Sequence, residues 1–496
     1  MSRKDAEIAK KEKKDRKQYS SILRLIGLNM KITNLKRTGV IALILLTGNL
    51  VGIAQVAART AIDERNVRAE MGFLAGDALQ GRGSGTLFER IAAEYIGSQF
   101  MQFGLEPAGE KGSDGKPTFV QTVTISRKTF AENPSIKFDA ATLTHGGEML
   151  VLRTNTDAAT GVLQKLEAGG KPNPGSAVLM RAKEGDDQRA AMQGAMALAS
   201  AGAAIVFVEE TPQWRGNWAA MASRMPSYTA SQAKPAVMIV VSKAAAAEIA
   251  NAAEGTKFDF GGKLAPSKDQ FTWNAMGKII GSDPKLASEV ILLTSHLDHL
   301  GVRENAPGDD KIFNGADDDA SGSVAVLELA RVLAAGKRPK RTVYFVCFGS
   351  EEAGGFGARY FVENMPFPKE KLVANLEFEM IGRPDAKVKP EELWLTGYER
   401  SNLGPELAKR GAKLVQDPHP EENFFQRSDN IQLARAGVIA HTVSSFGLHT
   451  DYHRSSDEVK TIDFLHMTRA INSMIAPIQW LVNSNFVPAW VEGKRP

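Results

Sequence analysis

Cysteine is almost absent from this chain, because its 496 residues include a single one, Cys347. An intramolecular disulfide is therefore excluded. Cys347 lies within an apolar run, so we expect a buried free thiol. A nucleophilic role is not expected, because no group that would lower the pKa of the thiol is visible outside the polar motifs described below.

Excess positive charge is also missing outside the first 38 residues. Those residues carry twelve Lys or Arg and four Asp or Glu, a local net charge of +8. The whole chain has a net charge of +4, so the remainder has a net charge of −4. The basic balance belongs to the leader, and no nucleic-acid partner is expected.

The apolar stretch near the amino terminus, residues 39–54, is short. It follows Lys36-Arg37, and Val56-Ala57-Ala58 after it is typical of a cleavage site, so 1–58 is interpreted as a basic leader plus a signal peptide. A charged preamble of this length is unusual before a secretion signal, so our hypothesis is that translation begins at Met30. The alternative is an uncleaved membrane anchor, for which the stretch is near the short limit. Either way, the rest of the chain is expected to be secreted, periplasmic or anchored outside the cytoplasm.

Two clusters of chemically active side chains follow the first strand-like run, residues 290–294. His296 and Asp298 come just after it, and at a spacing of two one can bind a metal while the other orients it. Three successive aspartates, 317–319, precede a helical pattern at 320–333. Helix capping needs one of them, whereas three like charges close together repel unless a cation is present.

A third cluster follows a second apolar run, residues 342–348, and contains the adjacent Glu351 and Glu352. Of two such glutamates, one can ligate a metal while the other takes a proton from the attacking water. A third apolar run, residues 372–378, ends in Glu379, and His453 lies in the C-terminal part. A lone histidine is more often structural, but in a chain with these clusters it becomes a candidate ligand.

The order of these motifs resembles the co-catalytic dizinc aminopeptidase family, which also contains glutamate carboxypeptidase, the glutaminyl cyclases and the transferrin receptor. A further similarity at 79–86 extends the resemblance towards the start of the mature chain. The motifs that carry it are His296-Leu297-Asp298, the segment 314–322, Gly349-Ser350-Glu351-Glu352, Glu379 before Met380-Ile381-Gly382-Arg383, and Tyr452-His453.

The resemblance implies a role for each of these residues and a cofactor of two Zn²⁺ ions per chain. One departure is that the family usually has an aspartate where this chain has Glu379, which is one methylene longer and follows Glu377 by two residues. We expect Glu379 to ligate if the strand end sits further back or its carboxylate turns. The implied metal ligands are His296, Asp318 as the bridge between the ions, Glu352, Glu379 and His453, and the implied catalytic residues are Glu351 as general base and Asp298 as a positioning group.

Alternating strands and helices from about 275 to 480 predict an α/β fold with a mostly parallel sheet flanked by helices, which is zinc exopeptidase-like under this resemblance. The expected peptidase domain is split into 59–129 and 271–496. Between them, residues 130–270 show no metal-type cluster but contain short apolar strands at 176–180, 203–208 and 236–241 and a helix at 188–201. This segment resembles the protease-associated insert that forms a lid in many relatives, and a domain that only stabilises the enzyme or binds a partner is equally compatible.

The predicted function is a secreted or periplasmic zinc aminopeptidase that hydrolyses N-terminal residues from peptides. Alternatives are a carboxypeptidase or other amidohydrolase, a non-catalytic binding protein that keeps the fold, and a single-zinc glutaminyl cyclase. A carboxypeptidase would need a basic pocket for the substrate carboxylate. The candidate arginines for it are Arg383, Arg427 and Arg454, although salt bridging is the more common role of such residues.

A pocket that selects the substrate side chain is a separate question. The candidates to line it are Phe424, Phe425, Phe446 and Tyr452, although aromatic residues more often belong to the core.

Overall fold

The computed structural model describes residues 61–496, except 168, 182–187, 230–233 and 267–268. The predicted leader, the start at Met30 and the cleavage site all lie outside the described residues. Residues Ile62–Pro496 form one compact unit. In the described part of the chain, no helix combines the length and the apolar character needed to cross a membrane.

The main sheet has nine strands, and the four at its centre run parallel. Two of these four strands, Val290–His296 and Thr342–Phe348, are buried along their whole length, as their continuous apolar runs predicted. Side chains alternate between two cores: Leu293 packs on one face and Leu292 on the other. The central strands, in spatial order, are β17 (Thr342–Phe348), β14 (Val290–His296), β18 (Leu372–Phe378) and β21 (Ala440–Ser444).

Antiparallel strands extend both edges of this parallel centre. On one side β13 (Gln270–Ile279) pairs with β17, and it also carries β1 (Glu106–Pro107) and β2 (Val120–Ile125). On the other side β19 (Leu393–Leu395) pairs with β21, and β20 (Leu414–Gln416) with β19.

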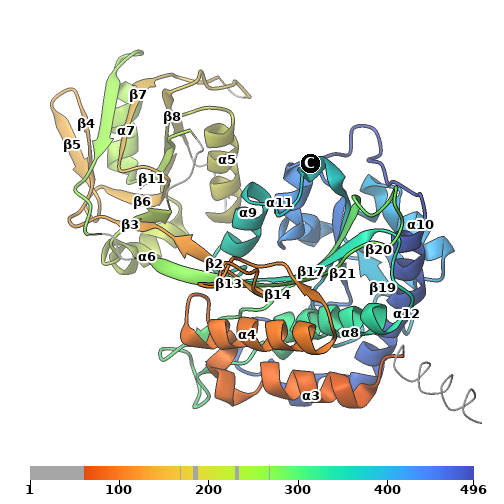
Figure 1. The fold of residues 1–496 in the computed structure, drawn as a ribbon. Coiled ribbons are helices and arrows are strands. Elements are labelled where there is room, and N and C mark those ends of the chain that lie inside the picture. The colour runs from red at the N-terminus through yellow and green to blue at the C-terminus, as the bar shows by residue number, and fades with distance from the viewer. Residues whose placement is uncertain (1–60, 168, 182–187, 230–233, 267–268) are drawn as a thin grey trace, which may run out of the picture. The chain divides into compact units, whose positions relative to one another are not determined.

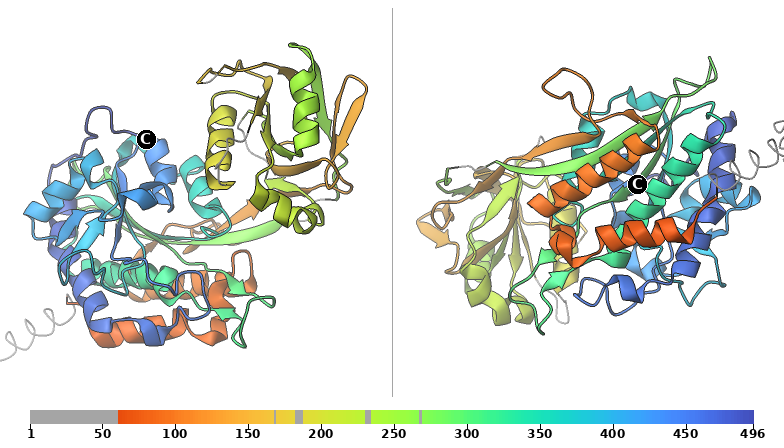
Figure 2. Two further views of the ribbon diagram at one scale, coloured as in Figure 1. Left: turned by 180° about the vertical axis from the view of Figure 1, so that it is seen from behind. Right: turned by 60° about the horizontal axis from the view of Figure 1, so that its bottom comes forward.

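Helices cover both faces of the sheet (Figures 1 and 2). The first face carries α3 (Glu64–Leu74), α4 (Leu87–Gln102), α8 (Gly322–Ala335) and α12 (Phe464–Asn483). The second carries α9 (Phe356–Glu363) and α11 (Asn430–Arg435), while α10 (Leu403–Lys409) packs on β20 and α12. The predicted α/β fold with a helix-flanked sheet is therefore confirmed.

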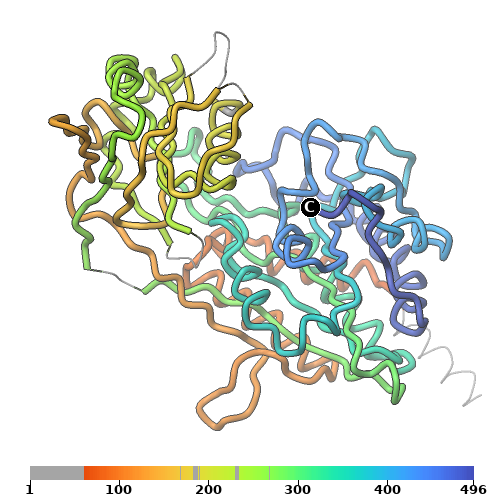
Figure 3. Tube along the Cα trace, turned by 90° about the horizontal axis from the view of Figure 1, so that it is seen from above, coloured from red at the N-terminus to blue at the C-terminus, as the bar shows by residue number. Residues whose placement is uncertain are grey.

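The chain leaves the main sheet after β2 and returns to it at β13, and the intervening residues build a second sheet of eight strands (Figure 3). The predicted strands and helix appear as β8 (Ser176–Met180), β9 (Ile205–Glu209), β11 (Val237–Val241) and α5 (Gln188–Ser200). Its assignment to the protease-associated type stays a prediction. The other elements are β4 (Ser135–Phe138), β5 (Ala141–Thr144), β6 (Met149–Thr154), β7 (Ala158–Leu163), β12 (Lys257–Gly261), α6 (Pro212–Ala222), α7 (Lys243–Asn251) and the separate pair β3 (Arg127–Thr129) and β10 (Ser227–Thr229).

Candidate metal centre

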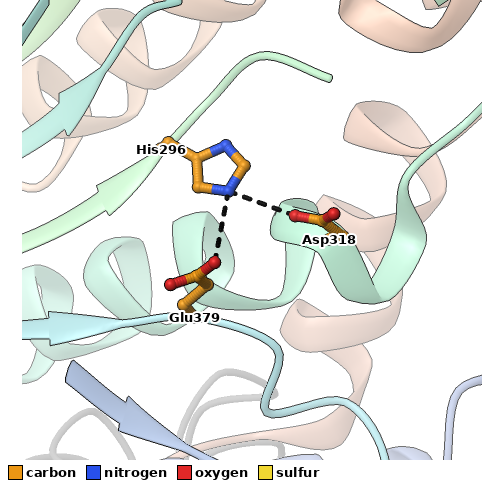
Figure 4. Close-up of side chains that lie close together, drawn as sticks. All are labelled: His296, Asp318 and Glu379. Carbon is orange, nitrogen blue, oxygen red and sulfur yellow. Dashed lines mark ion pairs between the residues drawn. The ribbon is translucent and has the colours of Figure 1, made fainter. Parts of the chain in front are cut away.

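His296 is the last residue of β14 and is fully buried. Its Nδ1 lies 3.2 Å from the backbone oxygen of Asp298, an acceptor, so Nδ1 donates and Nε2 keeps a free lone pair. That Nε2 lies 3.2 Å from Oδ1 of Asp318 and 3.9 Å from Oε1 of Glu379 (Figure 4). Three potential ligand atoms therefore converge on one point beyond the strand end.

A second group of ligand atoms shares Asp318 with the first. Nε2 of His453 lies 3.1 Å from Oδ2 of Asp318 and 3.1 Å from Oε1 of Glu352. His299, which the sequence analysis missed, forms the group of three with Asp318 and Glu352, whose ligand atoms lie within 4.8 Å of one another, and its Nδ1 is 2.9 Å from Oε1 of Glu352. Asp318 thus presents one oxygen to each group, the geometry of a bridging carboxylate.

The two groups fit divalent cations. Four of their buried atoms have no hydrogen-bond partner: Nε2 of His296, Nδ1 of His299, Oδ2 of Asp318 and Oε1 of Glu352. Buried polar atoms are rarely left unpaired, and lone pairs that converge in this way are a donor set for a metal. Nitrogen and oxygen donors without thiolate suit catalytic zinc.

The charges of the site agree with this donor set. Burial works against ionisation of Asp318, but its contacts with His296 and His453 hold its pKa well below the usual range. Burial likewise opposes the charged form of His453, yet its close contacts with the carboxylates of Asp318 and Glu352 raise its pKa to about 10. The shared carboxylate of Asp318 is therefore held ionised and surrounded by positive charge, which is the role of the metal when it is bound.

The three successive aspartates have different tasks. They lie in a π-helical turn, Ala316–Ser321, directly before α8, and the Asp318–Asp319 peptide bond is cis. Asp319 accepts backbone N–H groups from His296, Gly322 and Met380. Asp317, the first of the three in sequence, accepts a hydrogen bond from the backbone N–H of Gly382 and forms ion pairs with His449 and Arg383. Only Asp318 faces the ligand atoms, so the repulsion expected of three carboxylates is relieved by backbone donors at the other two.

Glu351 lies beside the ligand groups without belonging to them. Its backbone N–H donates to Oδ1 of Asp298 at 2.9 Å, and Oδ2 of Asp298 accepts from the hydroxyl of Ser84. Burial raises the pKa of Glu351 well above its usual range, and the carboxylates of Asp429 and Glu379 raise it further. A carboxyl group with a raised pKa next to a metal site has the property that a general base needs.

The segment 79–86 holds the catalytic loops in place. Arg82 is buried and donates to the backbone oxygens of Leu297, Asn314 and Gly315, which belong to the first two motifs. Glu89 in α4 accepts from the backbone N–H of Ser350, the residue before Glu351. The sequence similarity at 79–86 therefore corresponds to a segment whose hydrogen bonds hold the loops of the site in position.

Glu379 and Glu377 point to different partners. Oε2 of Glu377 accepts from the backbone of Asn430 at 2.6 Å and from Thr442 at 3.2 Å, so this carboxylate is used inside the fold. Glu379, just beyond β18, faces His296 instead, and burial raises its pKa to about 8. The structure therefore brings Glu379 into the ligand group at the position where an aspartate is usual.

A small cavity of about 30 Å³, here called the aromatic pocket, lies beside Glu379. Three of the four candidate aromatic residues line it, together with Trp394: they are Phe424, Phe446 and Tyr452. The fourth, Phe425, packs in a hydrophobic core.

The candidate arginines are mostly engaged by carboxylates. Arg383 pairs with Asp451 at 2.7 Å, and Arg427 pairs with Glu422 at 3.0 Å although it also borders the aromatic pocket. Arg454 is exposed and lines none of the cavities described here. Salt bridging, the more common role, thus applies to Arg383 and Arg427.

Residues 274–477 match the sequence profile of peptidase family M28. The leupeptin-inactivating enzyme 1 of Streptomyces exfoliatus is 36% identical over 231 residues, which cover 44% of this chain and 50% of that protein. An aminopeptidase of Pseudomonas aeruginosa (strain UCBPP-PA14) is 35% identical over 117 residues, 23% of this chain and 19% of that protein. The chain thus spans half or less of the length of these relatives.

A solved structure of an aminopeptidase from Aneurinibacillus sp. strain AM-1 shares the fold. It covers 87% of this chain and 97% of that one, with a TM-score of 0.50 and 18% sequence identity. The match of residues 274–477 to peptidase family M28 agrees with what the order of the motifs predicted.

Proposed function

We propose that this protein is a zinc aminopeptidase that binds two zinc ions and removes N-terminal residues from peptides. The observation that carries the proposal is the pair of ligand groups that share Asp318, with Glu351 next to them. The first zinc would be held by His296, Asp318 and Glu379, and the second by Asp318, Glu352 and His453. When bound, the metal would supply a Lewis acid and lower the pKa of water towards neutrality.

The remaining chemistry belongs to the side chains. Glu351 would take the proton of the attacking water and return it to the departing amine. Asp298 would fix the position of Glu351 by accepting its backbone N–H, and Ser84 would fix Asp298 in turn. His296 is kept in the tautomer that leaves Nε2 available by its bond to the backbone of Asp298.

The aromatic pocket supports an exopeptidase with a preference for apolar side chains. It is small, it adjoins Glu379, and four of its ten lining residues are aromatic, so it suits one small side chain rather than an extended chain. The carboxylate of Glu379, which lines it, would favour the positively charged amino terminus of a peptide over a blocked one. The expected substrates are therefore peptides with a free amino group and an apolar first residue.

A panel of aminoacyl anilides tests this proposal. Turnover of free-amine anilides with apolar residues, its loss with a zinc chelator and its return on addition of zinc are the expected results. Equal turnover of N-blocked anilides would contradict an aminopeptidase and would move the protein to the amidohydrolases. Bound zinc without any turnover would instead support a binding protein that keeps the fold.

A carboxypeptidase is the second candidate, because a basic cavity lies beside the loop that carries Glu351. Release of the C-terminal residue from N-blocked peptides would establish it. The size of that cavity favours the aminopeptidase, as argued in the next subsection.

We also propose that the protein acts outside the cytoplasm, as the signal-like segment 39–58 predicts. Fractionation of the producing cells, followed by mass spectrometry of the mature amino terminus, tests this. A mature chain that begins near residue 59 in the periplasm or the medium is expected. An intact leader in the cytoplasm would contradict the proposal, and peptides from residues 1–29 would exclude the start at Met30.

A further inference from the structure

A cavity of about 780 Å³ adjoins the candidate metal centre and shares no lining residue with the aromatic pocket. Ser350 and Ala353, on either side of the two catalytic-loop glutamates, line it. Ser84, which binds Asp298, lines it too. A chain that reaches the metal centre can therefore continue into this space.

Four arginines from four different elements border the cavity. Arg127 comes from β3, Arg153 from β6, Arg359 from α9 and Arg435 from α11. We call this space the basic cavity. The inserted sheet and the peptidase domain each provide part of its charge, since β6 belongs to the former and α9 and α11 to the latter.

Among the described residues, the lining of the basic cavity carries positive charge and no carboxylate. Within the described residues none of the four arginines forms an ion pair. Arg127 donates to the hydroxyl of Ser227, a neutral partner. Burial lowers the pKa of Arg359, and the charges of Arg153 and Arg435 lower it further, whereas the carboxylates of Asp429 and Glu363, outside the lining, raise it. The three arginines therefore lie within electrostatic range of one another.

An arrangement of this kind selects anions. A concave surface lined by charge of one sign concentrates ligands of the opposite sign. The guanidinium group presents paired N–H donors that match the two oxygens of a carboxylate. Most other arginines near the metal centre are already paired with acids, as Arg383 is with Asp451. The four in the basic cavity form no ion pair within the described residues, although Arg127 uses its Nε–H on Ser227.

The sizes of the two cavities indicate which part of a substrate each receives. The aromatic pocket suits a single side chain, whereas the basic cavity has room for several residues. In an aminopeptidase the single residue is the first one, and the rest of the peptide, which ends in a carboxylate, departs on the other side. A carboxypeptidase would need the reverse, a small basic pocket for one terminal residue.

We propose that the basic cavity binds carboxylate groups of the departing part of the peptide, so that the preferred substrates are short or acidic peptides. This inference rests on the proposed function. The carboxylate has two sources, the C-terminus and acidic side chains, and both present the same group to the arginines.

Peptides that differ only in the carboxylate test the inference. The substrates are Leu-Gly-Gly-Gly with a free C-terminus, its C-terminal amide, the amide with glutamate at the third position, and leucine p-nitroanilide, which carries no carboxylate. We expect kcat/KM to be about tenfold higher for the free acid than for the amide, mainly through KM. Recovery of the rate by the glutamate peptide would assign the binding to acidic side chains as well, and no recovery would restrict it to the C-terminus.

Variants connect the preference to the cavity. In the double variant Arg153→Gln/Arg359→Gln we expect the ratio of kcat/KM for the free-acid peptide to kcat/KM for its amide to fall to about one. Turnover of leucine p-nitroanilide should stay within about twofold of that of the unmodified protein. Arg90→Gln, an exposed arginine of α4 outside the cavity, is the matched control and should keep the ratio. A ratio near one in the unmodified protein, or an unchanged ratio in the double variant, would overturn the inference.

A binding measurement separates failure of this inference from failure of the proposed function. Calorimetry on the zinc-loaded Glu351→Gln variant compares the affinities of the acid and the amide without turnover. About tenfold tighter binding of the acid supports the basic cavity even if the anilides show that the enzyme is not an aminopeptidase. Equal affinities would overturn the inference while leaving anilide turnover, and with it the proposed function, intact.

Discussion

The two sheets of this protein have similar architecture, but the side chains at the carboxyl ends of their parallel strands differ. In each, parallel strands with apolar residues lie at or near the centre, and cores cover both faces. At the end of β9 in the inserted sheet, Glu209, the last residue of the strand, pairs with Arg181, and the next residue, Glu210, pairs with Arg215. After the central strands of the main sheet, carboxylates meet histidines instead, and several ligand atoms keep no partner.

The difference shows that the fold supplies a position and the side chains supply the chemistry. The carboxyl ends of parallel strands gather polar groups in both sheets. Where arginine neutralises the carboxylates, the result is a salt bridge. Where histidine and a second carboxylate face the same point, the result is a site that favours a cation.

Removal of the shared ligand should have the largest effect. In Asp318→Asn the shape is kept but the charge is lost from both ligand groups, so zinc affinity should fall more than about 100-fold and turnover should be abolished. Metal content measured by mass spectrometry checks this. Glu210→Gln, at the end of the inserted strand, is the control and should keep its zinc; a zinc-loaded Asp318→Asn enzyme would refute the shared role.

Glu351→Gln separates proton transfer from metal binding. Because Glu351 lies outside both ligand groups, the variant should retain zinc while kcat falls about 10² to 10⁴-fold. Parallel measurements of metal content and kcat are needed. Glu363→Gln, on the exposed end of α9, should leave both unchanged. A kcat close to that of the unmodified enzyme would remove Glu351 from the role of general base.

Metal removal should affect the two sheets unequally. At a zinc concentration about 1,000 times the dissociation constant, bound metal stabilises a protein by about 4 kcal/mol, which chelation would withdraw. Hydrogen exchange should then increase in the loops after β14 and β17 and stay unchanged in β8, β9 and β11. Equal loss of protection in the inserted sheet would show that the two sheets open as one cooperative unit.

Acid should destabilise the fold through a histidine remote from the metal. His441 is buried, its Nδ1 donates to the backbone of Thr396, and burial lowers its pKa from 6.5 to about 4. The neutral form is favoured in the folded state, so stability is complete above pH 6.5 and declines as the pH falls towards 4, by about 3 kcal/mol in total.

Urea unfolding of the metal-free protein between pH 7 and 4.5 checks this expectation. The histidines of the metal centre titrate in the same experiment, so the informative quantity is the difference between the unmodified protein and His441→Gln. The variant should lose less stability on acidification. Parallel pH profiles for the two proteins would mean that the protonation of His441 contributes nothing.

Much of the fold follows from local sequence patterns. The strand Thr342–Phe348 and the strand Leu372–Phe378 have the bounds that their apolar runs predicted, because a strand buried on both faces needs an unbroken apolar run. The ordered motifs placed His296 and Glu351 at strand ends for the same reason. The helix at 188–201 was also predicted within one residue.

The division of labour within the motifs needed the tertiary structure. Asp317, Asp318 and Asp319 lie in a turn with non-helical backbone angles, where no sequence period tells which carboxylate faces the site. His299 was missed because β14 ends at His296, and beyond it the alternation of side chains no longer holds. A histidine so close to His296 and Asp298 was the available signal.

The sequence by itself determined the elements, their order and the residue types that a metal centre needs, because these depend on neighbours along the chain. Only the tertiary structure decided which side chains meet. Asp318 reaches both His296 and His453, which are separated by more than 150 residues. The four arginines of the basic cavity lie on four separate elements, and their common surface exists only because two sheets fold next to one another.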